Sequence, residues 1–93
     1  MANEIFVGQS LLLLNLETNL DISSGSNPKI RYQKPSGATG EWVATVNGTT
    51  KVQYNVLAAD LDEDGVWIFQ SYIEVGGQEG YGAYVEKEVE PIL

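Results

Sequence analysis

Two residue types are missing from the 93-residue sequence, which contains no cysteine and no histidine. Without cysteine there is no disulfide framework, thiol nucleophile or zinc–thiolate site. Without histidine the chain lacks the commonest general base and the usual metal ligand. Because these side chains carry much of enzyme chemistry, the sequence predicts a scaffold or binding domain and not an enzyme.

Positive charge is scarce, with five Lys and Arg against 13 Asp and Glu, for a net charge of −8. So few cations cannot neutralise a run of phosphates, and anionic membrane surfaces would repel the chain. We therefore expect no nucleic-acid partner and no membrane partner, whereas a basic partner or a divalent cation suits the charge. The first apolar segment is preceded by no Lys or Arg, so no secretory signal is indicated and we expect synthesis in a cytoplasm.

Long apolar runs and helical periodicity are also lacking. The leucine run at residues 11–14 is too short for a membrane span, which needs about 20 apolar residues. What recurs is alternation of apolar and polar residues between Gly- and Pro-containing turns. The chain is too short for a second core, so residues 1–93 are expected to form a single domain. About seven short strands of this kind are typical of an antiparallel β-sandwich, with a barrel of the same strands as the alternative.

The alternation predicts which side chains face the core. Residues 11–16 are continuously apolar apart from Asn15, and this segment is expected to be a strand that is buried on both sides or lies at a sheet crossing. Asn47-Gly48 is a signal for a type I′ hairpin turn. The core-facing residues predicted by the alternation are Ile30, Tyr32, Trp42, Ala44, Val46, Val52, Tyr54, Val56, Trp67, Phe69, Ile73 and Val75.

An acidic loop, Asp-Leu-Asp-Glu-Asp-Gly at residues 60–65, matches the first half of a calcium-binding loop. Asp60, Asp62 and Asp64 would be the ligands, because hard cations take several carboxylate oxygens. The second half does not match, since the twelfth position is Ser71 and a strand pattern follows where a helix is required. This excludes an EF-hand and leaves two interpretations: a loop-bound calcium ion, or a solvated turn whose carboxylates accept hydrogen bonds from backbone amides. No other cofactor is predicted.

The same loop leads into Glu63-x-Gly65-x-Trp67-x-Phe69, which is similar to the corner before strand F of immunoglobulin domains. Trp67 stands where that corner usually has a tyrosine, and Phe69 stands where the cysteine would be. The fold class predicted from the sequence is therefore an all-β, immunoglobulin-like antiparallel β-sandwich.

A series of short motifs in order along roughly residues 5–90 resembles a group of small phage and prophage structural proteins with an immunoglobulin-like sandwich. The resemblance implies a non-enzymatic virion component, as a capsid decoration, head fibre, tail or baseplate domain. It also implies other virion proteins as partners, several copies or a homo-oligomer, and a virion location after synthesis in the host cytoplasm. The charged residues 86–90 depart from the aromatic last strand of this group, so the pairing of that strand is open. The motifs are Ile30-Arg31-Tyr32-Gln33-Lys34-Pro35-Ser36-Gly37, Trp42, Val52-Gln53-Tyr54, Asp60-Leu61-Asp62, Gly65-Val66-Trp67 and Gln70-Ser71-Tyr72-Ile73.

Three tyrosines support an alternative function. Tyr72 falls on the strand face opposite Trp67, which makes it a candidate surface aromatic. Tyr81 and Tyr84 are expected to point to opposite faces, so that one of them is exposed. Exposed tyrosines bind proteins and sugars well. Together with the acidic loop, these residues would form a carbohydrate-binding or adhesion module.

Overall fold

The computed structural model describes residues 5–8, 10, 12–57 and 59–91. Within these residues the chain forms nine β-strands and no helix, which confirms the all-β prediction with more strands than the sequence indicated. The described part of the chain accordingly has no helix with the length and apolar character needed to cross a membrane.

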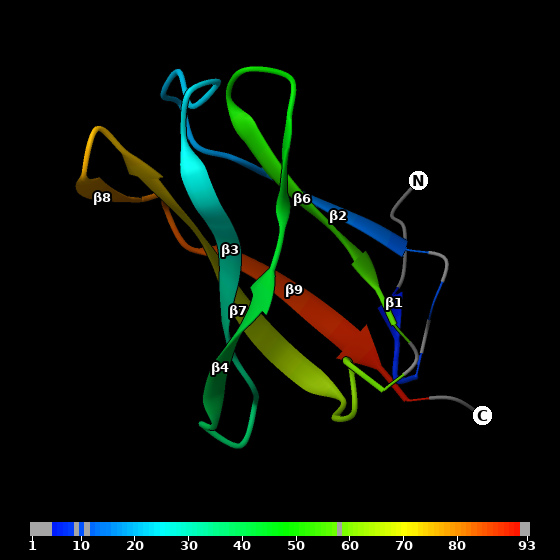
Figure 1. The fold of residues 1–93 in the computed structure, drawn as a ribbon. Helices are drawn as coiled ribbons and strands as arrows, with labels where there is room; N and C mark the ends of the chain where they lie inside the picture. Colours follow the sequence, from blue (N-terminus) through cyan, green and yellow to red (C-terminus); the bar gives the residue numbers. More distant parts are fainter. Residues whose placement is uncertain (1–4, 9, 11, 58, 92–93) are drawn as a thin grey trace.

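The strands are arranged in two sheets (Figure 1). Neighbouring strands are antiparallel except β1 and β9, which are parallel. The arrangement is consistent with the predicted β-sandwich. Sheet A has the order β1 (Ile5–Phe6), β9 (Val85–Glu90), β7 (Gly65–Val75), β3 (Ser26–Gln33) and β4 (Thr39–Val43), and β8 (Gln78–Tyr81) also pairs with β7. Sheet B has the order β2 (Leu12–Glu17), β6 (Lys51–Val56) and β5 (Thr45–Asn47).

The aromatic residues form the centre of the core. Trp67 is fully buried, and its ring centroid lies 6.3 Å from that of Trp42 and 6.1 Å from that of Phe69. All twelve residues predicted to face the core are buried or pack against it. The alternation was sufficient for this prediction because successive side chains of a strand point to opposite faces.

Strand β2 corrects the expectation of a segment buried on both sides. Leu14 and Leu16 are buried, but Leu13 between them is 47% exposed. Sheet B packs against sheet A on one face only, so the other face of β2 meets solvent despite its leucine. A continuous apolar run in the sequence does not distinguish a strand that is buried on both faces from one that is buried on a single face.

The hairpin between β5 and β6 is present, but its turn is not type I′. Asn47 pairs with Lys51, which places residues 48–50 in the loop, and Gly48 has φ +68° while Asn47 does not have a positive φ. A type I′ turn requires positive φ at both central residues. That condition holds instead at Gly76 and Gly77, with φ +60° and +80°, in the tight turn between β7 and β8.

Two further features complete the fold. Between β4 and β5, the amide of Ala44 donates to the carbonyl of Pro28 over 2.9 Å, so one nearly continuous extended segment passes from sheet A to sheet B. The charged strand β9 pairs inside the domain, with β7 on one side and β1 on the other. This answers the question left open by its sequence, because only Val85 and Val89 need to face the core.

Candidate functional site

The acidic loop is fixed by hydrogen bonds to separate neighbours. Asp60 Oδ2 accepts from the Tyr54 hydroxyl over 2.6 Å and from the Leu57 amide over 2.7 Å. Burial and the hydrogen bond to Asp60 raise the pKa of Tyr54 to about 12. Asp60 therefore closes the connection between β6 and β7.

The next carboxylates point toward the turn between β3 and β4. Asp62 Oδ2 lies 2.9 Å from Lys34 Nζ, and this hydrogen bond is the main reason that the pKa of Lys34 is raised. Glu63 accepts from the Ser36 amide over 3.2 Å and from the Ser36 hydroxyl over 3.0 Å. Its carbonyl accepts from Trp67 Nε1 over 2.9 Å, which ties the loop to the core.

The loop thus does not bring Asp60, Asp62 and Asp64 together as a set of metal ligands. Across the described residues, no group of three or more Asp, Glu, His or Cys side chains is placed to hold a metal ion. Asp60 and Glu63 accept from backbone amides, as the interpretation of the loop as a solvated turn predicts. Calcium binding stays a prediction of the sequence motif alone.

The outer face of sheet A, which points away from sheet B, carries the tyrosines singled out in the sequence. Tyr72 lies on this face, but it is only 7% exposed, so the prediction of a surface aromatic was wrong. Tyr81 is its direct cross-strand partner, with ring centroids 5.3 Å apart, and Lys29 Nζ lies 5.7 Å from the centre of the Tyr72 ring. These neighbours from β8 and β3 cover the ring.

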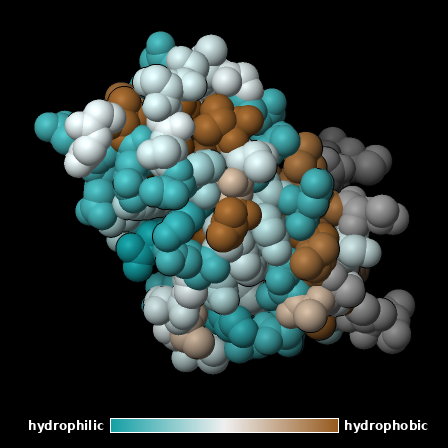
Figure 2. All heavy atoms as spheres, in the orientation of Figure 1, coloured by the Kyte–Doolittle hydropathy of each residue, from teal (hydrophilic) through white to brown (hydrophobic). Residues whose placement is uncertain are grey.

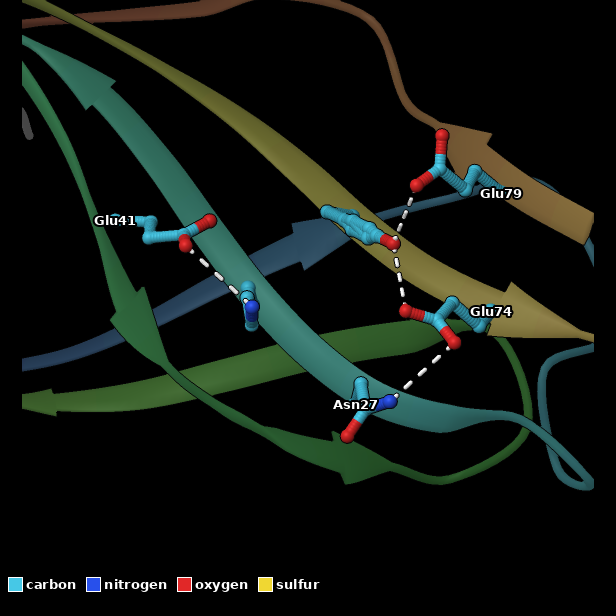
Figure 3. Close-up of polar contacts among 6 residues, drawn as sticks. Asn27, Glu41, Glu74 and Glu79 are labelled. Atoms are coloured by element: carbon cyan, nitrogen blue, oxygen red, sulfur yellow. Dashed lines mark hydrogen bonds and ion pairs between the residues drawn. The ribbon is translucent and has the colours of Figure 1, made fainter.

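The Tyr72 hydroxyl is held between two glutamates. It lies 2.7 Å from Glu74 Oε2 and 3.0 Å from Glu79 Oε2, and Glu74 Oε1 also accepts from Asn27 Nδ2 over 3.3 Å (Figure 3). The bond to Glu74 is the largest cause of the raised pKa of Tyr72, and the same bond lowers the pKa of Glu74. Lys29 forms an ion pair with Glu41 over 3.4 Å beside this group.

Tyr81 and Tyr84 are both exposed, at 48% and 74%, and both lie on the outer face of sheet A, so the prediction that they point to opposite faces was wrong. Tyr84 lies in the segment between β8 and β9. The side-chain amide of Gln70 donates to the carbonyl of Gly82 over 2.9 Å and so holds this segment against β7.

A hollow of about 280 Å³ adjoins Tyr84 on the same sheet. Arg31 and Gln33 reach it from β3, and the Arg31 guanidinium has no hydrogen bond or ion pair with any described residue. Both side chains alternate along β3 with Ile30 and Tyr32, which were predicted to face the core, but the sequence did not predict that they meet Tyr84, which is distant in the chain. The hollow is lined by Arg31, Tyr32, Gln33, Thr39, Ile68, Phe69, Gln70 and Tyr84.

Exposed apolar side chains occur elsewhere on the surface. In the view of Figure 2 they gather in separate patches among polar residues. Val43 and Leu57 are strongly exposed and line a second hollow, of about 290 Å³, beside β5 and β6. This second hollow has no charged lining residue, whereas the first combines a guanidinium, amides and an aromatic ring.

The first hollow and the two exposed tyrosines therefore form the candidate site, a binding face of sheet A. Comparisons of the chain with protein-family models, with curated proteins and with solved structures found no match.

Proposed function

We propose that the chain is a non-enzymatic binding domain with an immunoglobulin-like sandwich, and that it serves as a structural component of a phage virion. In this role it attaches to a capsid or tail through other virion proteins, in several copies. The motif series between Ile30 and Ile73 supports the virion role. The geometry of the two sheets supports the immunoglobulin-like arrangement.

The strand order favours an immunoglobulin-like topology. In immunoglobulin domains of the variable type one sheet contains strands G, F, C and C′, and the other contains B, E and D. Here β9, β7, β3 and β4 are neighbours in the first order, and β2, β6 and β5 in the second. The chain visits these strands in the corresponding sequence. One departure is that the buried Trp42 lies on β4, whereas the immunoglobulin tryptophan lies on strand C.

The corner before β7 gives a second argument. In immunoglobulin domains a tyrosine hydroxyl near the start of strand F bonds to the backbone a few residues upstream. Trp67 occupies the equivalent position, and its indole N–H donates to the carbonyl of Glu63, four residues earlier. The side chain differs, but the bond has the same function of fixing the loop to the sheet.

The binding role rests on one observation: Arg31, Tyr81 and Tyr84 are exposed together on sheet A, and a hollow adjoins two of them. Tyr and Arg are the side chains most often responsible for binding energy in protein interfaces. A free guanidinium adds directional donors that fix the orientation of a partner. This face is therefore the proposed contact with the rest of the virion.

Mass spectrometry of purified virions tests the virion role, because the chain should be present with the capsid and tail proteins. In complementation, Tyr84→Ala and Arg31→Gln should each lower the amount of chain per particle by about tenfold, the equivalent of ~1.4 kcal/mol of contact energy. Lys51→Gln, which removes an exposed cation from sheet B, is the matched control and should leave incorporation unchanged. If the chain is missing from purified virions, the virion role is wrong.

A second candidate function is carbohydrate binding, which the shape of the hollow favours. Its volume of about 280 Å³ is close to the lower end of the ~300–1,000 Å³ typical of ligand pockets, so it suits a single ring. Tyr84 offers an aromatic surface at the rim, and Arg31 and Gln33 offer hydrogen-bond donors. A glycan array with and without calcium should then give signals that Tyr84→Ala removes, and an array without signals would count against this function.

A further inference from the structure

The hollow on sheet A carries positive charge in an acidic protein. Arg31 is the only charged side chain among the described residues that line it, although the chain has 13 Asp and Glu against five Lys and Arg. Two glutamates lie just outside the lining, since Glu41 is the cross-strand partner of Arg31 and Glu86 is that of Ile68. Glu41 forms its ion pair with Lys29 over 3.4 Å and not with Arg31. The guanidinium is therefore left without a described counter-ion.

Hydrogen-bond donors gather on the β3 and β4 side of the hollow. Arg31, Gln33 and Thr39 are exposed there, and no hydrogen bond joins their side chains to another described residue. Gln33 and Thr39 are cross-strand partners, and Arg31 lies two residues from Gln33 on the same face of β3. A guanidinium only donates, and its planar fork matches the two oxygens of a carboxylate. Ile68 and Tyr84 add apolar surface from other strands and segments. The hollow therefore suits an oxyanion on a short apolar stem.

The balance of charge selects among the oxyanions. A phosphate monoester carries about −1.5 to −2 charges at pH 7, whereas Arg31 supplies one positive charge in a chain of net charge −8. A carboxylate carries one negative charge, so a single guanidinium neutralises it. A sugar acid fits less well, because its ring hydroxyls need polar partners and Ile68 offers none.

We propose that the hollow binds the carboxylate of an aspartate or glutamate side chain on a partner protein. Arg31 donates to both carboxylate oxygens, Gln33 and Thr39 are further donors beside it, and the stem of the partner side chain lies against Ile68 and Tyr84. The proposal rests on the binding role proposed above for this face, and it names the chemical group that the face recognises.

Titration of the isotope-labelled chain with N-acetyl-glutamic acid amide, followed by two-dimensional NMR at about pH 7 and 0.15 M salt, tests the proposal. At this ionic strength charges more than about 8 Å away are largely screened, so the local pair is measured. The amide signals of residues 31, 33, 68 and 84 should shift together, with a dissociation constant on the order of 10 mM for so small a probe. The matching glutamine derivative, which lacks the charge, should bind roughly two- to fivefold more weakly, as expected for one exposed ion pair.

Three variants locate the effect. Arg31→Gln should remove the preference for the glutamate probe, and the NMR spectrum shows directly whether the variant is folded. Arg31→Lys keeps the charge but loses the planar fork, so it should restore only part of the preference. Lys51→Gln changes the net charge by the same amount on sheet B and should leave probe binding unchanged.

The proposal is overturned if the two probes bind equally, if the shifted signals lie away from the hollow, or if Lys51→Gln acts like Arg31→Gln. Tighter binding of glucuronate than of the glutamate probe would identify an acidic sugar as the occupant instead of a protein side chain. If Arg31→Gln lowers incorporation into virions but the glutamate probe does not bind, the binding face stands and the carboxylate is wrong. If the probe binds and the chain is missing from virions, the carboxylate site stands and the virion role is wrong.

Discussion

Replacement of Trp67 tests the interpretation of the acidic corner as a determinant of the fold. The side chain is fully buried, its ring centroid lies 5.6 Å from that of Tyr32, and its indole N–H holds the Glu63 carbonyl. Truncation of a large aromatic residue in a core costs ~3–5 kcal/mol. A domain of 93 residues has a total stability of roughly 5–14 kcal/mol. Trp67→Ala should therefore leave the protein close to unfolding.

Two further variants divide this effect into its parts. Trp67→Phe keeps an aromatic ring but leaves the Glu63 carbonyl without its donor, which costs ~1–3 kcal/mol in addition to a smaller cavity term. Asp62→Asn removes the charge of a half-exposed ion pair with Lys34, and such pairs contribute only ~0–1 kcal/mol. The expected order of destabilisation is thus Trp67→Ala, Trp67→Phe and Asp62→Asn.

Urea unfolding followed by circular dichroism gives these free energies for all three variants, and Trp42 provides a fluorescence signal when Trp67 is replaced. The slope of the free energy of unfolding against urea concentration should be the same for all variants, so that their midpoint urea concentrations report differences in stability directly. A larger loss for Asp62→Asn than for Trp67→Phe would refute the reasoning, because the loop would then contribute more through its carboxylates than through its bond to the core.

Two other predictions concern the same corner. Tyr54→Phe removes the hydrogen bond to Asp60 and should cost ~0.5–1.5 kcal/mol at neutral pH. The pKa of Tyr54 is raised to about 12, so its hydroxyl stabilises the folded protein fully below the ordinary pKa of ~10, and this stability is lost as the pH rises toward 12. The free energy of unfolding of Tyr54→Phe should therefore lack this loss at alkaline pH. Gly65→Ala should cost ~1–3 kcal/mol, because Gly65 has φ +120° and an added Cβ would lie 2.9 Å from the Pro35 ring. Gly48→Ala, with positive φ but no atom within 4 Å of its Cβ, is the control, and equal melting temperatures for the two variants would contradict the close contact.

The alternation of the sequence was enough to identify the core, because the direction of a strand side chain depends on its own position. The surface could not be read in this way. Tyr72 was correctly placed on the outer face, yet its burial depends on Tyr81 and Lys29, and these become neighbours only through strand pairing. The hollow beside Tyr84 was missed for the same reason, since its lining comes from separate strands.

Tertiary contacts also decided which turn forms where the local sequence predicted a type I′ turn. Asn47-Gly48 has the strongest short-range preference for a type I′ turn, but the Asn47 side chain donates to Asn15 Oδ1 on β2 over 3.1 Å. Asn47 therefore ends a strand and takes no part in a two-residue turn. Similarly, the leucines of β2 indicated burial, whereas the number of layers decided that Leu13 faces solvent.

The parallel pairing of β1 and β9 has a mechanical consequence. Ile5 lies opposite Val89 and Phe6 opposite Glu90, and the Val7 amide donates to the Glu90 carbonyl over 2.9 Å. Tension applied between these two strands, outward along the chain, pulls them in opposite directions along their length. The hydrogen bonds are then loaded in shear and must break together, whereas an antiparallel pair would open one bond at a time. The short length of this ladder sets the tensile force that the domain withstands.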